Sequence, residues 1–289
     1  MAGGTLYLVA TPIGNLGDVS IRALEVLRTV PLIAAEDTRI SRRLLGRHQI
    51  ETRLTSYHSQ SDAARTAQLL AYLQGGEDLA LVTDAGTPSI SDPGMELAAA
   101  WASEGGRVEA IPGASAVLVA VAASGIAGPR WSFEGFLPRS GRERRERLTR
   151  LAADQRGAVL FEAPGRLLGT LRDLVVACGP ERPAAVCREL TKLHEQVIRG
   201  SLAALVTAAS DGTIPARGEI AIVIGWSSGA GSAALAESGE ATLVEARSSV
   251  ERLVRDGLAR GDAARQVAAA TGVPRRRLYQ APPAEGKGS

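Results

Sequence analysis

Four loops rich in glycine, proline and small polar residues each follow a short apolar run in this sequence. They are TPIGNLGD (11–18), DAGTPSISDPG (84–94), PGASA (112–116) and FEAPG (161–165). Glycine lets backbone amides approach a ligand closely, and proline sets the shape of a loop without needing a donor partner. One such loop is most often an ordinary turn. Because ligands of open α/β sheets lie outside the carboxyl ends of the strands, four such loops predict a shared pocket.

The familiar signatures of other ligand classes are absent from the sequence. It contains neither G-x-G-x-x-G nor G-x-x-x-x-G-K-[ST], which argues against a dinucleotide or a triphosphate. It also lacks H-E-x-x-H, C-x-x-C and G-x-S-x-G, the marks of zinc enzymes and serine hydrolases. With three His and two Cys in the chain, we expect no metal site and free thiols at Cys178 and Cys187.

The elements that must position these loops alternate between strand and helix. Apolar runs predict strands over 5–10, 31–35, 52–57, 79–82 and 107–111, with helical spacing between them. This alternation indicates an α/β domain with a mostly parallel sheet, and a second α/β unit follows. The polar, basic stretch 130–146 is predicted to be a linker. We therefore expect the following segments: an N-terminal α/β domain (1–128), a second α/β domain (129–226), a linker (227–242), a helix-turn-helix-like tail (243–281) and a disordered end (282–289).

Composition and charge favour a cytoplasmic protein. The chain of 289 residues is 45% hydrophobic and 22% charged, and its start lacks the pattern of a signal peptide. No apolar run approaches the roughly 18–20 residues of a membrane span, so we expect no membrane association. The stretch 139–150 holds six arginines against two glutamates. Such a run is usually a solvated helix face, but it also suits contact with phosphates.

Several segments together resemble the ribosomal RNA small subunit methyltransferase I family. They are VATPIGNLGDVSIRAL, AEDTRISRRLL, TDAGTPSISDPG, IPGASA, FEGFLPR, LFEAPGR and CRELTKLHEQVIRG, which run in order from about residue 5 to residue 225. This family is the ribose-methylating branch of the tetrapyrrole methylase superfamily. AEDTR and DAGTPSISDPG are specific to the branch, whereas PGASA is shared with the porphyrin and corrin methylases.

The resemblance implies a fold, a co-substrate and a reaction. It implies two α/β domains with S-adenosylmethionine (SAM) in the cleft between them, no metal, and a homodimer. The implied reaction is methylation of the ribose 2′-hydroxyl of a cytidine in the decoding region of 16S ribosomal RNA, in the assembled 30S subunit. Two alternatives stay open at this point: a tetrapyrrole C-methyltransferase and a non-catalytic ribosome-binding protein.

The resemblance also assigns roles to individual residues. The implied SAM contacts are Pro12, Asp84, Gly86, Ile90, Ser91, Ser115, Ala116 and Ala163. Plain helix caps are the alternative for Ser115 and for Asp92. Glu36, Asp37 and Lys192 are the candidate catalytic residues, where Lys192 requires a strongly depressed pKa to act as a base. A solvated face or an ion pair is the alternative for each of them.

RNA binding requires an exposed basic surface. The candidate contacts are Arg39, Arg139, Arg142, Arg144, Arg166 and Arg188. Aromatic residues make up only 3% of the chain, which argues against a base-stacking platform of the single-strand-binding type. The tail is expected either to dock on RNA or to pack as an accessory bundle.

Overall fold

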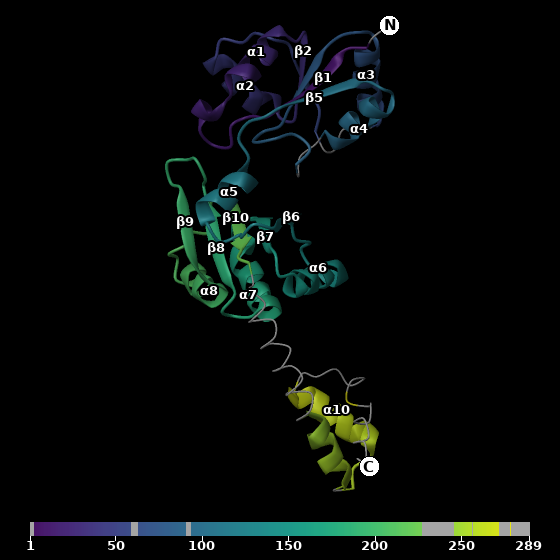
Figure 1. Cartoon of the computed structure of the whole chain (residues 1–289), viewed down its shortest axis with the longest axis vertical. Helices are drawn as coiled ribbons and strands as arrows, with labels where there is room; N and C mark the ends of the chain where they lie inside the picture. The colour runs from purple at the N-terminus through teal and green to yellow at the C-terminus, as the bar shows by residue number, and fades with distance from the viewer. Residues whose placement is uncertain are drawn as a thin grey trace. The chain divides into compact units, whose positions relative to one another are not determined.

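The computed structural model describes residues 3–58, 63–90, 94–226, 246–255, 257–271 and 278. The chain divides into two compact units, of which the first ends at Trp226. The first unit contains two five-stranded sheets with helices packed against them, which confirms the predicted α/β class (Figure 1).

The first sheet is entirely parallel and has the order β3-β2-β4-β1-β5. Its strands are β1 (Thr5–Val9), β2 (Leu32–Ala35), β3 (Leu54–Ser56), β4 (Leu79–Val82) and β5 (Arg107–Ile111). Every residue of β2 and β4 is buried, as expected where helices cover both faces of a parallel sheet.

Two pairs of helices cover the two faces of this sheet (Figure 1). These helices are α1 (Ile21–Thr29) and α2 (Thr38–Arg47) on one face, and α3 (Ala63–Gln74) and α4 (Met95–Ser103) on the other; the 3-10 turn η1 (Leu16–Asp18) precedes α1. Leu27 and Leu45 anchor the first pair in the core, and Leu73 and Trp101 anchor the second. The apolar stripe of each helix is thus buried against the strands.

The second sheet is mixed and has the order β6-β7-β10-β8-β9. Its strands are β6 (Trp131–Phe136), β7 (Gly157–Glu162), β8 (Pro183–Arg188), β9 (Gln196–Ser201) and β10 (Ile220–Ile224). Only β6 and β7 run parallel, whereas β10 lies antiparallel between β7 and β8. The start of β10 therefore lies at the same edge as the carboxyl ends of β7 and β8, since Ile220 pairs with both Glu162 and Arg188.

Helices cover both faces of this second sheet as well. The helices on one face are α6 (Gly141–Ala153), α7 (Leu167–Cys178) and α8 (Leu202–Ser210), and the 3-10 turn η2 (Pro164–Arg166) precedes α7. On the other face lies α5 (Ala116–Ser124), whose Val117 and Ala120 are buried among residues of β7, β8 and β10. Helix α5, which we predicted within the N-terminal domain, thus packs against the second sheet (Figure 1).

The predicted linker over 130–146 is wrong, because these residues form β6 and the start of α6. Strand β6 is a half-buried edge strand, and only Arg144 and Leu151 of α6 are buried. An edge strand followed by a helix with one buried stripe has the polar composition of a linker, so composition alone misled the prediction.

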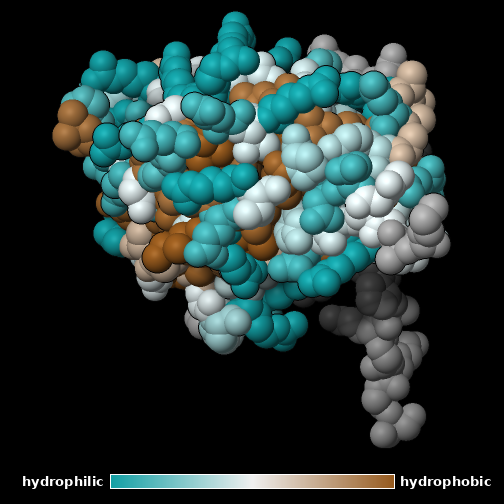
Figure 2. All heavy atoms as spheres, turned by 90° about the horizontal axis from the view of Figure 1, so that it is seen from above, coloured by the Kyte–Doolittle hydropathy of each residue, from teal (hydrophilic) through white to brown (hydrophobic). Residues whose placement is uncertain are grey.

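The second unit contains two described helical segments, 246–255 and α10 (Arg260–Thr271). The buried apolar side chains described in this unit are Ala246, Val250, Ala263, Ala264, Val267 and Leu278. The predicted linker (227–242) and disordered end (282–289) lie outside the described residues. In the part of the chain that the structure covers, no helix combines the length and the apolar character that crossing a membrane requires. The face shown in Figure 2 is mostly hydrophilic, with patches of hydrophobic residues between the hydrophilic ones.

Candidate functional site

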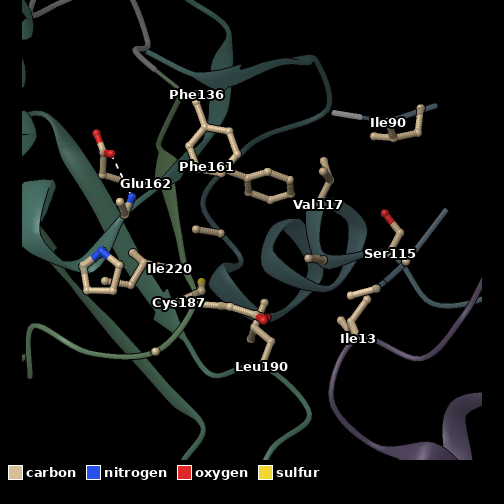
Figure 3. A pocket seen from close by; sticks show the side chains of 18 of the residues that line it. Ile13, Ile90, Ser115, Val117, Phe136, Phe161, Glu162, Cys187, Leu190 and Ile220 are labelled. Atoms are coloured by element: carbon tan, nitrogen blue, oxygen red, sulfur yellow. Dashed lines mark hydrogen bonds between the residues drawn. The ribbon is translucent and has the colours of Figure 1, made fainter. Parts of the chain in front are cut away.

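A cavity of about 390 Å³ lies where the strand ends of the two sheets meet. From the first sheet, the loops after β1, β4 and β5 line it, and from the second sheet, the ends of β6, β7 and β8 and the start of β10. Its lining residues are Ile13, Ala85, Gly86, Thr87, Ile90, Ser115, Ala116, Val117, Phe136, Phe161, Glu162, Ala163, Pro164, Cys187, Leu190, Gly218, Glu219, Ile220 and Ala221. In Figure 3 the ring of Phe161 lies toward the side chain of Val117, and both residues line the cavity. The shared pocket predicted from the four loops therefore exists.

Backbone hydrogen bonds join the loops after β1 and β4 into one wall. The Thr11 amide donates to the Gly86 carbonyl (2.8 Å), and the Gly86 amide donates to the Thr11 carbonyl (3.1 Å). The Thr11 hydroxyl donates to the Thr83 carbonyl at 3.1 Å. Gly86 has a φ of +86°, a backbone conformation that favours glycine. These hydrogen bonds hold the two loops together as one wall of the cavity.

The start of α5, which follows the loop after β5, also lines the cavity. Ser115 is the N-cap of α5, and its hydroxyl accepts from the Leu118 amide at 3.5 Å. The cap alternative is thus correct, and Ser115 lines the cavity as well. Ala116 follows it, and its small side chain leaves room above the helix.

Aromatic and buried polar side chains build the opposite wall. The rings of Phe136 and Phe161 lie 5.7 Å apart between centroids. The Glu162 carboxylate accepts from the Ala163 amide (2.8 Å) and from the Thr170 hydroxyl (2.5 Å), and lies 3.2 Å from the Arg166 guanidinium. Figure 3 shows the bond between Glu162 and Ala163 at the edge of the cavity. These contacts fix the backbone at the carboxyl end of β7.

The structure brings most of the predicted SAM contacts together. Gly86, Ile90, Ser115, Ala116 and Ala163 all line the large cavity. Pro12 and Asp84 instead line a smaller neighbouring cavity, and Ser91 lies outside the described residues.

Sequence reasoning missed the lining residues Phe136, Cys187, Leu190 and Gly218. Leu190 follows the carboxyl end of β8, and ligands of α/β sheets lie outside such ends, so it could have been predicted. Gly218 precedes β10 and carried no such signal, because the antiparallel direction of that strand is not written in its sequence.

Backbone hydrogen bonds link Glu36, Asp37 and Asp84 at the ends of β2 and β4. The Asp37 amide donates to the Asp84 carboxylate (3.0 Å), and the Asp84 amide donates to the Glu36 carboxylate (3.3 Å). Burial raises the pKa of both Glu36 and Asp84 above their ordinary values. A carboxylate with a raised pKa is a better proton acceptor near neutral pH, so this pair suits general-base chemistry.

Asp37 differs from its two neighbours. Its carboxylate caps α2 through the Arg39 amide (2.8 Å) and pairs with the Arg39 guanidinium (2.6 Å). These hydrogen bonds lower the pKa of Asp37 to about 2. The predicted catalytic role of Asp37 as a base is therefore not supported, since so acidic a group holds a proton poorly.

Lys192 lies in the loop after β8, against the loop after β1. Burial acts to lower its pKa, but hydrogen bonds to Glu189 (2.9 Å) and Glu219 (3.1 Å) outweigh burial, and the pKa is raised. A β-carbon on Gly14 would lie 2.5 Å from Cγ of Lys192, so the two loops are in close contact. The depressed pKa that a catalytic base requires is absent, and Lys192 is a cation that joins the loops.

The structure separates the six predicted RNA contacts into two groups. Arg144 and Arg188 are buried, which contradicts their assignment. Arg144 donates to Asp173, Thr170 and the Pro138 carbonyl, and Arg188 donates to Gln196 and to two backbone carbonyls.

The other four arginines are at least partly accessible. Arg166 is held by Glu162 and by the Leu137 carbonyl, with part of its side chain exposed. Arg39, Arg139 and Arg142 are exposed, so phosphates can reach their side chains.

No group of three or more His, Cys, Asp or Glu suited to a metal ion occurs among the residues with a described position.

Sequence comparison relates nearly the whole chain to known proteins. The family model described as Tetrapyrrole (Corrin/Porphyrin) Methylases matches residues 5–206. A Synechocystis protein named ribosomal RNA small subunit methyltransferase I is 47% identical over 277 residues, covering 96% of this chain and 96% of its own. A Mycobacterium tuberculosis protein of the same name is 43% identical over 284 residues, covering 97% of this chain and 95% of its own.

Solved structures share the fold at much lower sequence identity. Cobalt precorrin-4 methyltransferase has a TM-score of 0.60 and 20% identity, and the match covers 77% of this chain and 95% of that chain. Uroporphyrin-III C-methyltransferase from Thermus thermophilus, complexed with S-adenyl homocysteine, has a TM-score of 0.56 and 17% identity, covering 77% and 97%.

Proposed function

This chain belongs to the tetrapyrrole methylase family, among the proteins named ribosomal RNA small subunit methyltransferase I, and we propose that it methylates a ribose 2′-hydroxyl. The methyl donor is SAM, and the substrate is a cytidine in the decoding region of 16S ribosomal RNA. The observation that carries the proposal is the 47% identity to a relative of that name, because it extends over both sheets that build the cavity.

The large cavity fits SAM by size and by lining. Its volume of about 390 Å³ lies within the range of roughly 300–1,000 Å³ that small-molecule sites occupy. Gly86, Ala116 and Ala163 line it with little or no side chain, while Phe161 and Ile90 add apolar surface. These residues would hold SAM, which supplies an electrophilic methyl group on a sulfonium centre when bound.

Glu36 and Asp84 are the groups that we assign to the proton of the ribose hydroxyl. Attack by a hydroxyl oxygen releases a proton, and a positioned base contributes about 10²–10⁴-fold to such a step. Asp84 adjoins Ala85 of the large cavity, and its amide is bonded to Glu36. Positioning of the hydroxyl by the rigid loops supplies a further part of the rate.

The exposed arginines Arg39, Arg139 and Arg142 are proposed to contact RNA phosphates. We propose that the assembled 30S subunit is the substrate, and that the enzyme is a cytoplasmic homodimer that requires no metal. The competing tetrapyrrole activity belongs to structural neighbours that are 17–21% identical to this chain, against 40–47% for the rRNA methyltransferase relatives.

The test is methyl transfer from labelled SAM by the purified protein to small subunits that lack the modification. We expect one new 2′-O-methyl cytidine in the decoding region and no transfer to uroporphyrinogen in parallel. Methylation of uroporphyrinogen alone would replace this function with the tetrapyrrole reaction. Calorimetry that detects no SAM binding would indicate a non-catalytic ribosome-binding protein.

A further inference from the structure

Phe136, at the end of the edge strand β6, lines the large cavity but has no role in the function proposed above. It is 52% exposed, and its ring packs against that of Phe161 (Figure 3). An aromatic side chain carries a large apolar surface, and ligand pockets are lined mainly by such surface. The exposed part of this ring is therefore apolar surface that a molecule in the cavity can cover.

A β-bulge in β6 decides on which face of the sheet this ring lies. Phe133 pairs with Val159 of β7. Three residues further along β6, Phe136 pairs with Phe161, which is only two residues further along β7. Because side chains alternate between the two faces of a strand, Phe136 would lie on the opposite face from Phe133 without this extra residue. With the bulge, both rings contact Phe161, with 5.0 and 5.7 Å between centroids. Bulges beside active sites often redirect a side chain in this way.

Arg147 of α6 holds the bulge from outside the cavity. Its guanidinium donates to the carbonyl of Glu134 and to the carbonyl of Phe136 (2.9 Å), one on each side of Gly135. Gly135 has a φ of +59°, a backbone conformation that favours glycine. The planar fork of a guanidinium suits two acceptors at once. Arg147 thus fixes the backbone on both sides of the residue that makes the bulge possible.

Two further arginines hold the residues that follow Phe136. Arg166 donates to the Leu137 carbonyl (2.8 Å), and Arg144 donates to the Pro138 carbonyl (2.8 Å). An edge strand leaves part of its backbone without a strand partner, and these donors take the place of one. The segment that carries Phe136 is therefore fixed on both sides of the ring.

We propose that Phe136 contacts bound SAM, and that Arg147 is a positioning residue for it. The ring covers part of the SAM molecule with its exposed apolar surface. Arg147 does not line the cavity; it acts by holding the bulge that turns the ring toward the cavity. The proposal rests on the proposed use of SAM as methyl donor, and adds one residue that binds SAM and one that orients it.

The test measures the Kd for SAM by calorimetry in Phe136→Ala, in Arg147→Ala and in the double variant. In Phe136→Ala the Kd should rise about 5- to 30-fold, because a covered aromatic side chain buries roughly 150–250 Å² and Phe136 leaves about half of its surface to the ligand. In Arg147→Ala it should rise about 3- to 10-fold, since hydrogen bonds that order the bulge are lost. The double variant should bind SAM no more weakly than Phe136→Ala, because Arg147 acts through the ring.

Arg145→Ala is the matched control, because Arg145 lies on the same helix and is exposed. Its Kd for SAM should stay within about twofold of the wild type. The Tm of Phe136→Ala should fall by at most about 5 °C, since the half-exposed ring contributes one aromatic pair to the fold. If Arg147→Ala does not fold, Arg147→Lys replaces it in the same comparison, because an ammonium donates without the planar fork.

Two results would overturn the proposal. The first is a Kd for SAM in Phe136→Ala within twofold of the wild type; if kcat/KM for small subunits falls in that variant nevertheless, the ring contacts RNA instead. The second is a double variant in which the two single effects multiply, because Arg147 would then have a structural role that is independent of Phe136.

The affinity measurements keep this proposal distinct from the function on which it rests. A wild-type protein that binds SAM but methylates no subunits would refute the proposed rRNA reaction, and the same comparison of Kd values would still decide the roles of Phe136 and Arg147. A wild-type protein that binds no SAM would overturn both proposals.

Discussion

Replacing Arg144 by alanine should destabilise the fold, whereas the same change at Arg142 should not. Both arginines lie on α6 in one basic run, and the sequence suggests the same RNA-binding role for both. The Arg144 side chain is 10% exposed and donates to Asp173 (2.7 and 2.9 Å), the Pro138 carbonyl (2.8 Å) and the Thr170 hydroxyl (3.0 Å). The Arg142 side chain is 85% exposed.

The size of the effect follows from the partners that Arg144→Ala leaves behind. Pro138 and Thr170 each lose a donor in a buried region, at about 1–3 kcal/mol apiece. The Asp173 side chain is 47% exposed and regains water, so the loss stays below the roughly 3–5 kcal/mol of a fully buried pair. We expect a loss of about 3 kcal/mol, which is roughly 6–12 °C in Tm for a unit of this size.

The effect should reach the large cavity, the proposed SAM site, through Thr170. The Thr170 hydroxyl also donates to Glu162, which holds the Ala163 amide at the cavity wall. SAM affinity should therefore fall in Arg144→Ala, and Arg144→Lys should be intermediate, because an ammonium cannot reproduce the planar fork of the guanidinium.

Arg142→Ala is the matched control on the same helix. Its pair with Glu146 (2.7 Å) is solvent-exposed, and such pairs contribute about 0.2–1 kcal/mol. If Arg142 contacts a phosphate, RNA affinity should fall in Arg142→Ala. The slope of the logarithm of the binding constant against the logarithm of salt concentration should become shallower by about one unit. Thermal unfolding and RNA binding at several salt concentrations measure both effects. A Tm of Arg144→Ala within about 2 °C of wild type would refute the reasoning.

The remaining predictions concern the two cavities and their rims. Gly86→Ala should cost about 1 kcal/mol, because φ there is +86°, and should weaken SAM binding by calorimetry; unchanged affinity would contradict the assigned wall. At pH 8 native Cys187 should resist iodoacetamide, since burial raises its pKa to about 11; rapid labelling would show that the thiol is accessible. Because burial raises the pKa of Glu36 and Asp84, kcat should rise with pH above the ordinary carboxylate range and then level off, and Glu36→Gln should remove this limb. If Glu36→Gln keeps the rise of kcat with pH, Glu36 is not the base. The folded state holds these protons more tightly than the unfolded chain, so their contribution to the free energy of unfolding is lost as pH rises through the raised pKa. Lys192→Arg should keep kcat within roughly fivefold, since a guanidinium cannot act as a base; complete loss would return Lys192 to the catalytic candidates.

The location of the site was predictable because it depends on local features of the sequence. Gly86 and Ala116 follow apolar runs, and the carboxyl ends of parallel strands meet at one edge of a sheet. The loops after β1, β4 and β5 therefore had to lie together once these strands became neighbours. The family resemblance added the ligand, which spacing and composition did not provide.

The chemistry of individual charged residues was not predictable in the same way. Arg144 is paired with Asp173, 29 residues away, and Arg188 with the Arg217 carbonyl, also 29 residues away. Lys192 needed a depressed pKa to be a base, but hydrogen bonds to Glu189, three residues away, and to Glu219, in a distant part of the chain, outweigh burial and raise its pKa. Burial and partners decide the role of a charge, and both are set by residues far apart in the sequence.

The sequence by itself determined the alternation of strands and helices and the glycine-containing loops at the strand ends. Those features depend on hydrophobic periodicity and on backbone conformations that act over a few residues. Only the tertiary structure decided the strand order, the antiparallel β10 that brings Gly218 to the cavity, and the packing of α5 on the second sheet. Strand pairing and desolvation join residues that are distant in sequence, so no local pattern encodes them.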